Sequence, residues 1–254
     1  MAKASARPAS RRRSRPSLRT RVRTFWLLAA IVGLAAGYGT YRAIAWPGFR
    51  LSHLDVTGLH VVERAEVVRR AGLDPHANVW LLNLRAATRR IEAIPYVRSA
   101  YVRRIVPARV AIDIVERTPD GCVTTVAGSL LIDADRRVLA SDCAARPEPR
   151  YRLTGEPPAT PGAFLHDARL AHLQSDAHQL THDGVALAAL EHDRFGDLDA
   201  TLRSGIRVLL GAESDLDQKA ALLGPILQTL QKYSRPIETV DLRAPATPVV
   251  VYRH

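Results

Sequence analysis

The sequence predicts an α+β protein in which a single transmembrane helix precedes two folded domains. Three observations lead to this prediction. Residues 25–46 form an apolar stretch directly after a basic segment. Residues 47–117 carry patterns in the order β-α-α-β-β. Residues 118–254 alternate short strand patterns with two helical stripes, which indicates a mixed α/β domain with an antiparallel sheet.

The positive charge is concentrated at the N-terminus. The 254 residues carry 36 Lys and Arg against 25 Asp and Glu, a formal charge of +11. Nine of the basic residues and no acidic residue lie within residues 1–24, so the rest of the chain has a net charge of only +2. Residues 1–24 hold too few apolar side chains to offset the entropy of ordering, and we predict a disordered basic tail. The nearly neutral body argues against a nucleic-acid-binding surface.

Residues 25–46 are predicted to span the membrane. No charge interrupts the run from Phe25 to Tyr41, and 22 helical residues rise roughly 33 Å, enough to cross a bilayer core. The positive-inside rule puts the tail in the cytoplasm and residues 47–254 on the extracytoplasmic side of the inner (plasma) membrane. A cleaved signal peptide is the alternative, because Ala43-Ile44-Ala45 has the small-x-small form of a cleavage site.

Two features of the N-terminal region have alternative interpretations. Gly33 and Gly37 form a G-x-x-x-G step that would let another membrane helix approach closely, although glycine is common in membrane helices generally. One interpretation of the basic tail is that it contacts anionic lipid or binds a specific partner. The alternative is that it only orients the membrane helix.

The first domain, residues 47–117, begins after the helix-breaking Pro47-Gly48. Gly72 ends one helical stripe, and Asn83 is placed to cap a second helix, which Pro95 ends. In chain order the predicted elements are a strand at 51–56, helices at 63–71 and 84–94, and strands at 97–106 and 110–115.

The second domain, residues 118–254, is predicted from period-two patterns and turn residues. Residues 144–162 are rich in Pro and Gly and are predicted to be a surface loop. Helical stripes cover residues 170–180 and 216–230. The predicted strands lie at 121–126, 129–132, 137–140, 185–191, 199–202, 206–210, 237–243 and 248–253.

Short motifs in the first domain resemble a POTRA (polypeptide-transport-associated) domain. Their order, directly after one basic-flanked membrane helix, resembles the bacterial cell-division protein family FtsQ/DivIB. The motifs are Asp55-Val56-Thr57-Gly58, Asn78-Val79-Trp80, Pro95-Tyr96-Val97, Arg103-Arg104-Ile105-Val106-Pro107 and Ile114-Val115-Glu116-Arg117-Thr118-Pro119.

The second domain resembles the β-domain of the same family. The matching segments are Leu131-Ile132-Asp133, Gly205-Ile206-Arg207-Val208, Lys219 and Val240-Asp241-Leu242-Arg243. The chain departs from the family pattern after this last motif. Pro245 and Pro248 replace an aromatic and glycine-containing turn, and they remove backbone donors at the approach to the last strand.

The resemblance implies a non-enzymatic divisome scaffold at the division septum, whose β-domain binds partners of the FtsB/DivIC and FtsL type. A final strand often lies at a sheet edge, where a partner strand can pair with it. The alternative is that the last strand only completes the sheet. The predicted partner-binding residues are Asp241, Leu242, Arg243, Val249, Val250, Val251 and Tyr252.

Two other functional classes stay open: an anchored extracytoplasmic cell-wall enzyme, and a POTRA-type transport or chaperone module. The sequence holds no G-x-S-x-G, P-loop or G-x-G-x-x-G motif, so no catalytic residue and no cofactor is predicted. His166, His172, His178 and His182 lack a metal-binding motif, and we interpret them as solvated rather than as a metal site.

The two cysteines, Cys122 and Cys143, lie 21 positions apart in a compartment expected to be oxidising. We predict a structural disulfide between them. Two separate buried thiols are the alternative.

Overall fold

The computed structural model of the chain describes residues 18–44, 46–125, 128–143, 149–153, 159–230 and 235–253. These residues belong to two compact units. The first unit holds the chain as far as His53, together with Asp74–Leu82 and Arg104–Val110. The second unit holds Leu54–Leu73, Asn83–Arg103 and the chain from Ala111 onward.

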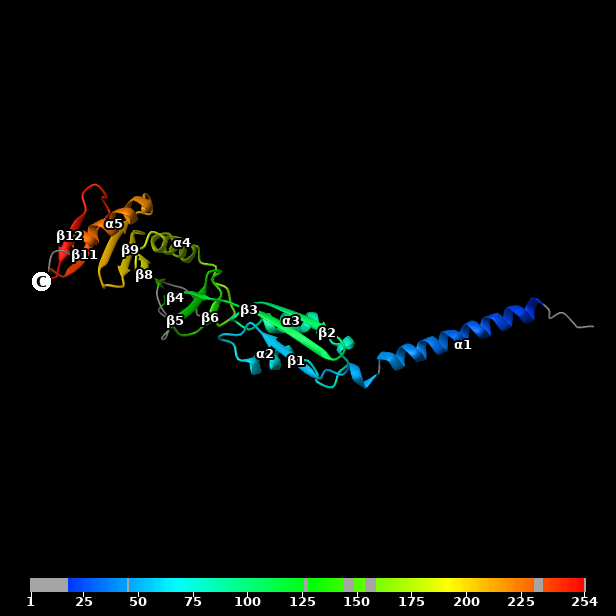
Figure 1. The fold of residues 1–254 in the computed structure, drawn as a ribbon. Helices are drawn as coiled ribbons and strands as arrows, with labels where there is room; N and C mark the ends of the chain where they lie inside the picture. The colour runs from blue at the N-terminus through cyan, green and yellow to red at the C-terminus, as the bar shows by residue number, and fades with distance from the viewer. Residues whose placement is uncertain are drawn as a thin grey trace, which may run out of the picture. The chain divides into compact units, whose positions relative to one another are not determined.

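The N-terminal helix α1 extends over Leu18–Ile44 (Figure 1). It begins before Phe25, so the last residues of the predicted disordered tail are helical, since leucine and arginine favour helix. The rest of the predicted tail, residues 1–17, lies outside the described residues. No helix in the described part of the chain has the length and apolar character needed to cross a membrane. The predicted membrane span therefore stays a prediction.

The β-α-α-β-β order predicted for residues 47–117 is confirmed (Figure 1). Two short 3-10 helices, Pro47–Phe49 and Val79–Leu81, occur in addition. The strands form a sheet in the order β1-β3-β2. The elements are β1 (His53–Thr57), α2 (Arg64–Ala71), α3 (Leu84–Glu92), β2 (Val97–Ile105) and β3 (Arg109–Glu116).

The predicted helix ends follow from local chemistry. Asn83 caps α3, because its side-chain oxygen accepts a hydrogen bond from the Ala86 N–H at 3.0 Å. Gly72 ends α2 in the left-handed region with φ of +57°, which glycine adopts at little steric cost. Both helices turn an apolar face inward, where Val67 of α2 and Ile91 of α3 are fully buried.

Glu116, at the end of β3, anchors the loop before α2. Its carboxylate accepts hydrogen bonds from the N–H groups of Val61 at 2.8 Å and Val62 at 2.9 Å. Burial raises the pKa of Glu116, but the backbone hydrogen bonds from Val62, His60 and Val61 outweigh it and hold the pKa below its ordinary value of 4.5.

Acidification is therefore expected to weaken this anchor. A carboxyl whose pKa is lowered by folding contributes stability above its unfolded pKa, and that stability is lost as the pH falls through the folded pKa. Glu116→Gln should lower the free energy of unfolding by about 1–2 kcal/mol at pH 7, because charge-assisted hydrogen bonds are lost. Urea denaturation at pH 7 and pH 3 checks this: the difference between the two proteins should shrink as the pH falls, and an undiminished difference at pH 3 would contradict the account.

The second domain contains a nine-stranded sheet in the order β12-β11-β10-β9-β8-β7-β4-β5-β6 (Figure 1). Two helices accompany it, α4 (Ala168–His182) and α5 (Leu216–Leu230). The strands are β4 (Pro119–Thr125), β5 (Gly128–Asp133), β6 (Val138–Ala140), β7 (Arg150–Arg152), β8 (Leu187–His192), β9 (Leu198–Leu202), β10 (Arg207–Gly211), β11 (Ile237–Asp241) and β12 (Val249–Tyr252).

The predicted antiparallel sheet is wrong, because the observed sheet is mixed. The pairs β4–β7, β7–β8 and β10–β11 are parallel. A parallel pair needs a long crossover between its strands. Helix α4 follows β7 and precedes β8, and helix α5 follows β10 and precedes β11, so the two predicted helices are themselves the crossovers.

A strand lies within the predicted surface loop at residues 144–162. Strand β7, Arg150–Arg152, pairs with β4 and with β8, and its central Tyr151 is fully buried. Residues 144–148 and 154–158 of the predicted loop lie outside the described residues. The strand is only three residues long, too short for a periodic pattern to be recognised.

One apolar cluster joins the two helices to the large sheet. From the helices it contains Leu170 and Leu173 of α4 and Leu223 of α5. From the sheet it contains buried side chains of the eight strands β4 to β11. The sheet members include Val123, Tyr151, Leu190, Ala200, Val208 and Val240. The predicted helical stripes at residues 170–180 and 216–230 therefore face the sheet.

A second, smaller cluster surrounds the two cysteines. Cys122 of β4 and Cys143 are joined by a disulfide with 6.0 Å between their Cα atoms. Both are buried with Leu131 and Leu139, and Tyr96 packs against the same cluster. The bridge ties the first strand of the large sheet to the segment that follows β6.

Arg117, between β3 and β4, joins the two domains within the second compact unit. Its guanidinium is paired with the buried carboxylate of Asp133 and, at 2.9 Å, with Asp135. Its Nε donates to the Val97 carbonyl at 3.3 Å, and its backbone N–H donates to the Tyr96 carbonyl at 2.7 Å. Arg117, the arginine of the Ile114–Pro119 motif, therefore links the start of β2 to the end of β5 and the turn that follows it.

Candidate functional site

Strand β12, Val249–Tyr252, forms one end of the large sheet (Figure 1). It pairs antiparallel with β11, placing Val250 opposite Val240 and Val249 opposite Asp241. No described strand pairs with its other side. A row of backbone groups is therefore left open along this edge, and it is the feature to which another strand can add.

The backbone alternation shows which groups face the open side. The Arg253 N–H donates to the Pro236 carbonyl at 2.9 Å, so at position 253 the backbone points toward β11. Backbone direction alternates along an antiparallel strand. The N–H and C=O groups of Val249 and Val251 thus face β11, and those of Val250 and Tyr252 face the open edge.

The side chains of β12 divide between two faces in the same alternating way. Val249 is 56% exposed and Val251 is 46% exposed, whereas Val250 and Tyr252 are half-buried on the other face. The guanidinium of Arg235 lies 5.9 Å from the centre of the Tyr252 ring. The edge therefore combines an exposed apolar pair with outward-facing backbone groups.

Pro245 and Pro248, which depart from the family pattern, do not prevent β11 and β12 from forming a hairpin. The Thr247 N–H donates to the Ala244 carbonyl at 3.0 Å, which closes a turn over residues 244–247 that contains Pro245. Strand β12 then begins at Val249, directly after Pro248. The backbone N–H groups that Pro245 and Pro248 lack therefore lie before the strand, where no hydrogen bond of the sheet requires them.

The predicted residues 241–243 divide into one core residue and one surface pair. Leu242 is fully buried, and its N–H donates to the Leu209 carbonyl at 2.8 Å. The side chain of Leu242 lies in the sheet core and is not exposed to a partner in this structure, so its partner role stays a prediction. Arg243 folds back on Asp241, with its Nε 3.0 Å from both carboxylate oxygens.

This ion pair is strengthened by its own hydrogen bonds. The side-chain hydrogen bond from Arg243 lowers the pKa of Asp241, and the same bond raises the pKa of Arg243. The Arg243 N–H also donates to Asp241 Oδ1 at 3.0 Å. The pair therefore presents a preformed charged feature at the end of β11.

Gly211, at the end of β10, leaves room for Arg243. Its φ is +72°, and a Cβ atom there would lie 2.9 Å from Arg243 Cγ. Gly211→Ala should lower the free energy of unfolding by about 1–2 kcal/mol, through backbone strain and crowding. Gly205→Ala is the matched control, because its φ is +83° with open space around it. Thermal or urea denaturation should give a smaller loss for the control, and equal losses would contradict the crowding.

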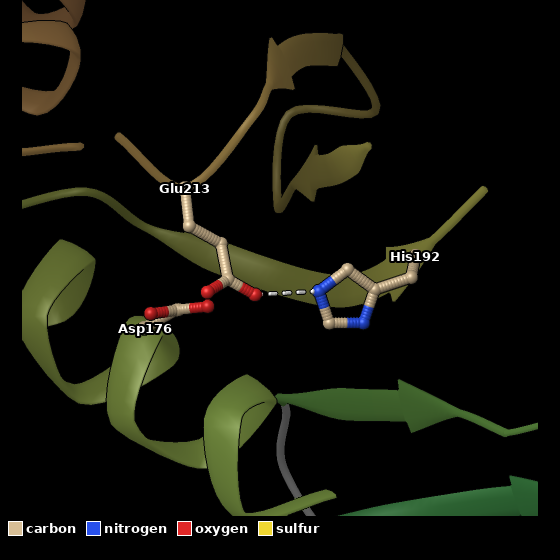
Figure 2. A group of neighbouring side chains, drawn as sticks. All are labelled: Asp176, His192 and Glu213. Carbon is tan, nitrogen blue, oxygen red and sulfur yellow. Dashed lines mark hydrogen bonds and ion pairs between the residues drawn. The ribbon is translucent and has the colours of Figure 1, made fainter. Parts of the chain in front are cut away.

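The remaining predicted residues belong to other elements of the chain. Gly33 and Gly37 are exposed on α1, and no atom outside the helix's own backbone lies within 4 Å of a Cβ placed at either. His178 is hydrogen-bonded to Asp120 at 2.6 Å, and the side chains of His178 and His182 are both exposed. The fold brings together three further residues that share no sequence motif, Asp176, His192 and Glu213 (Figure 2). They lie on three different elements, so no linear spacing could have found them.

Comparison with known families places both domains. The model of the FtsQ-type POTRA domain matches residues 49–117, and the model of the C-terminal region of the cell-division proteins FtsQ/DivIB matches residues 123–243. The two matches follow each other in the order of the β-α-α-β-β domain and the nine-stranded sheet. Together they cover most of the chain.

Individual relatives agree with the family models. The chain is 28% identical over 226 residues to cell division protein FtsQ of Geotalea daltonii, covering 85% of this chain and 80% of that protein. It is 25% identical over 250 residues to cell division protein FtsQ of Zymomonas mobilis, covering 93% of this chain and 76% of that protein. With both domains matched in order, the chain belongs to the FtsQ/DivIB family of bacterial cell-division proteins.

Proposed function

We propose that the protein is a non-enzymatic scaffold of the division machinery, and that it docks a partner by strand addition along β12. The observation that carries this proposal is the open edge, where Val250 and Tyr252 direct backbone groups away from β11. Strand addition uses such main-chain groups for affinity and alternating side-chain contacts for specificity. No reaction is assigned to the protein.

The chemistry of the edge defines the partner segment. Val249 and Val251 expose apolar surface on one face of β12, so the added strand should carry apolar side chains at alternate positions on that face. The Asp241–Arg243 pair lies at the adjoining end of β11 and favours a polar residue there. The family resemblance supports FtsB/DivIC-type and FtsL-type proteins as these partners.

We further propose a membrane topology that puts the β12 edge on the extracytoplasmic side. The uncharged run from Phe25 to Tyr41 within α1 serves as the single membrane anchor, with the basic segment before it in the cytoplasm. Residues 47–254 then lie on the extracytoplasmic side of the inner membrane. Gly33 and Gly37 lie four residues apart on α1, so a partner helix can approach them within the bilayer.

The test of the scaffold role is the position of the protein in living cells. A fluorescent fusion of the full chain should gather at the septum of dividing cells and be absent from the lateral envelope. A fusion carrying a substitution in β12 should show whether this edge contributes to recruitment of the partner to the septum. An even distribution of the unsubstituted fusion around the envelope in dividing cells would overturn the proposal.

A further inference from the structure

Three side chains that can bind a metal ion converge beside the large sheet (Figure 2). Asp176 comes from α4, His192 from the end of β8, and Glu213 from the turn after β10. One ligand atom from each lies within 4.8 Å of the other two. His192 Nε2 and Glu213 Oε1 are 2.9 Å apart.

The Asp176 carboxylate provides an independent indication of a cation-binding site. Asp176 is only 9% exposed, and its Oδ2 is buried without a hydrogen-bond partner among the described residues. Figure 2 shows the Asp176 carboxylate directed toward that of Glu213. A buried carboxylate facing a second one is costly unless a cation lies between them.

The surroundings leave space for the further ligands of an ion. A cavity of about 400 Å³ adjoins the cluster, and His172, His192 and Glu213 help to line it. The arginines of this cavity already have carboxylate partners: Arg152 pairs with Glu191 and Arg169 with Asp167. Neither arginine is therefore needed to neutralise Asp176 and Glu213.

The fold holds the three elements in place. Lys219 of α5 is almost fully buried, and its Nζ donates to the Ala212 carbonyl at 2.6 Å, which fixes the turn that presents Glu213. Asp176 lies in the middle of α4, whose apolar residues pack on the sheet. The ligand atoms need only small side-chain rotations to reach the separations of roughly 3.4 Å that bonds of 2.0–2.2 Å around a tetrahedral ion produce.

We propose that Asp176, His192 and Glu213 bind a single zinc ion, with its fourth position open to the cavity. An imidazole nitrogen favours zinc over magnesium or calcium, which prefer sets made only of oxygen atoms. Two carboxylates neutralise the ion, and three protein ligands with one open position are a common zinc arrangement. The proposed site does not depend on partner docking at β12, so either proposal can fail without the other.

The experiment is a titration of the purified full chain with zinc chloride, followed by calorimetry and by the melting temperature. The unsubstituted chain should bind one zinc ion, and zinc should raise its melting temperature, because an ion that binds only the folded state stabilises it. Magnesium and calcium chloride, titrated in parallel, should bind far more weakly. Asp176→Asn, His192→Gln and Glu213→Gln should each weaken zinc binding by roughly 100-fold or more, since even outer-shell partners of metal sites contribute 10–100-fold.

Two matched variants control for nonspecific binding. His182→Gln removes an exposed histidine of α4, and Glu238→Gln removes an exposed carboxylate of β11 that does not line the cavity. Both should bind zinc within about threefold of the unsubstituted chain, a spread far smaller than the loss of a ligand. Asp176→Asn should also be at least as stable as the unsubstituted chain without zinc, because the repulsion from Glu213 is gone, which separates a lost ligand from a lost fold.

Three results would overturn the proposal. The first is no zinc binding by the unsubstituted chain. The second is equal losses in the ligand variants and in the two controls, which indicates surface binding. The third is unchanged zinc binding in Glu213→Gln, whose exposed side chain can be replaced without disturbing the core.

Discussion

Replacing Arg117 by alanine is expected to lower the free energy of unfolding by roughly 3–5 kcal/mol, the cost of leaving a buried charge without its partner. The side chains of Arg117 and Asp133 are 8% and 5% exposed, so water cannot replace the lost cation. Asp133 retains a hydrogen bond from the Arg137 N–H at 2.8 Å, which does not neutralise it. The hydrogen bond from Arg117 to the Val97 carbonyl is lost as well.

Urea denaturation of the purified chain measures this effect, and Arg98→Ala is the matched control. Arg98 also pairs with Asp135, at 3.5 Å, but its side chain is 59% exposed. Exposed ion pairs contribute about 0–1 kcal/mol, so the control should change little. Adding Asp133→Asn to Arg117→Ala should recover part of the loss, because the unpaired charge is removed. A loss for Arg117→Ala no larger than that for Arg98→Ala would show that this pair does not hold the two domains together.

Val250→Pro is expected to weaken partner binding by about 10- to 100-fold, or about 1.4–2.8 kcal/mol, while the protein stays folded. The Val250 N–H faces the open edge and forms no bond with β11, so its loss does not affect the hairpin. Proline is tolerated at edge strands when the missing donor faces outward. An added strand would lose one main-chain hydrogen bond and would meet the proline ring.

Val250→Thr is the control, since threonine keeps the N–H and the β-branched shape. Binding of the full chain to purified FtsB/DivIC-type partner, measured by calorimetry, should be nearly unchanged in this control. Val250→Asp places a charge on the half-buried face and tests the side chain separately. A folded Val250→Pro protein that binds the partner as well as Val250→Thr does would exclude main-chain docking at this position.

The helices and most strands were predictable because their signals are local. Gly72 and Asn83 determine where α2 ends and α3 begins, and both act through the backbone within one turn. The turn at Asp133–Arg137 separates β5 from β6 through a local contact, in which Asp133 Oδ1 accepts a hydrogen bond from the Arg137 N–H. The POTRA and β-domain assignment followed from such motifs taken in order.

The pairing of strands and the burial of single residues were not predictable in the same way. Parallel pairing depends on where α4 and α5 carry the chain, which no local pattern specifies. Leu242 lies in a motif beside two charged residues, yet its burial depends on its position next to Leu209 of β10. The cluster of Asp176, His192 and Glu213 likewise exists only after α4, β8 and β10 have assembled.

The central claim is that a partner strand pairs with the open edge of β12, and amide hydrogen exchange tests it most directly. In the free chain, the amides of Val250 and Tyr252 should exchange faster than those of Val249 and Val251, which face β11. A saturating amount of FtsB/DivIC-type partner should slow exchange at Val250 and Tyr252, because their N–H groups then donate to the added strand. Unchanged exchange at both amides in the saturated complex would contradict docking by strand addition.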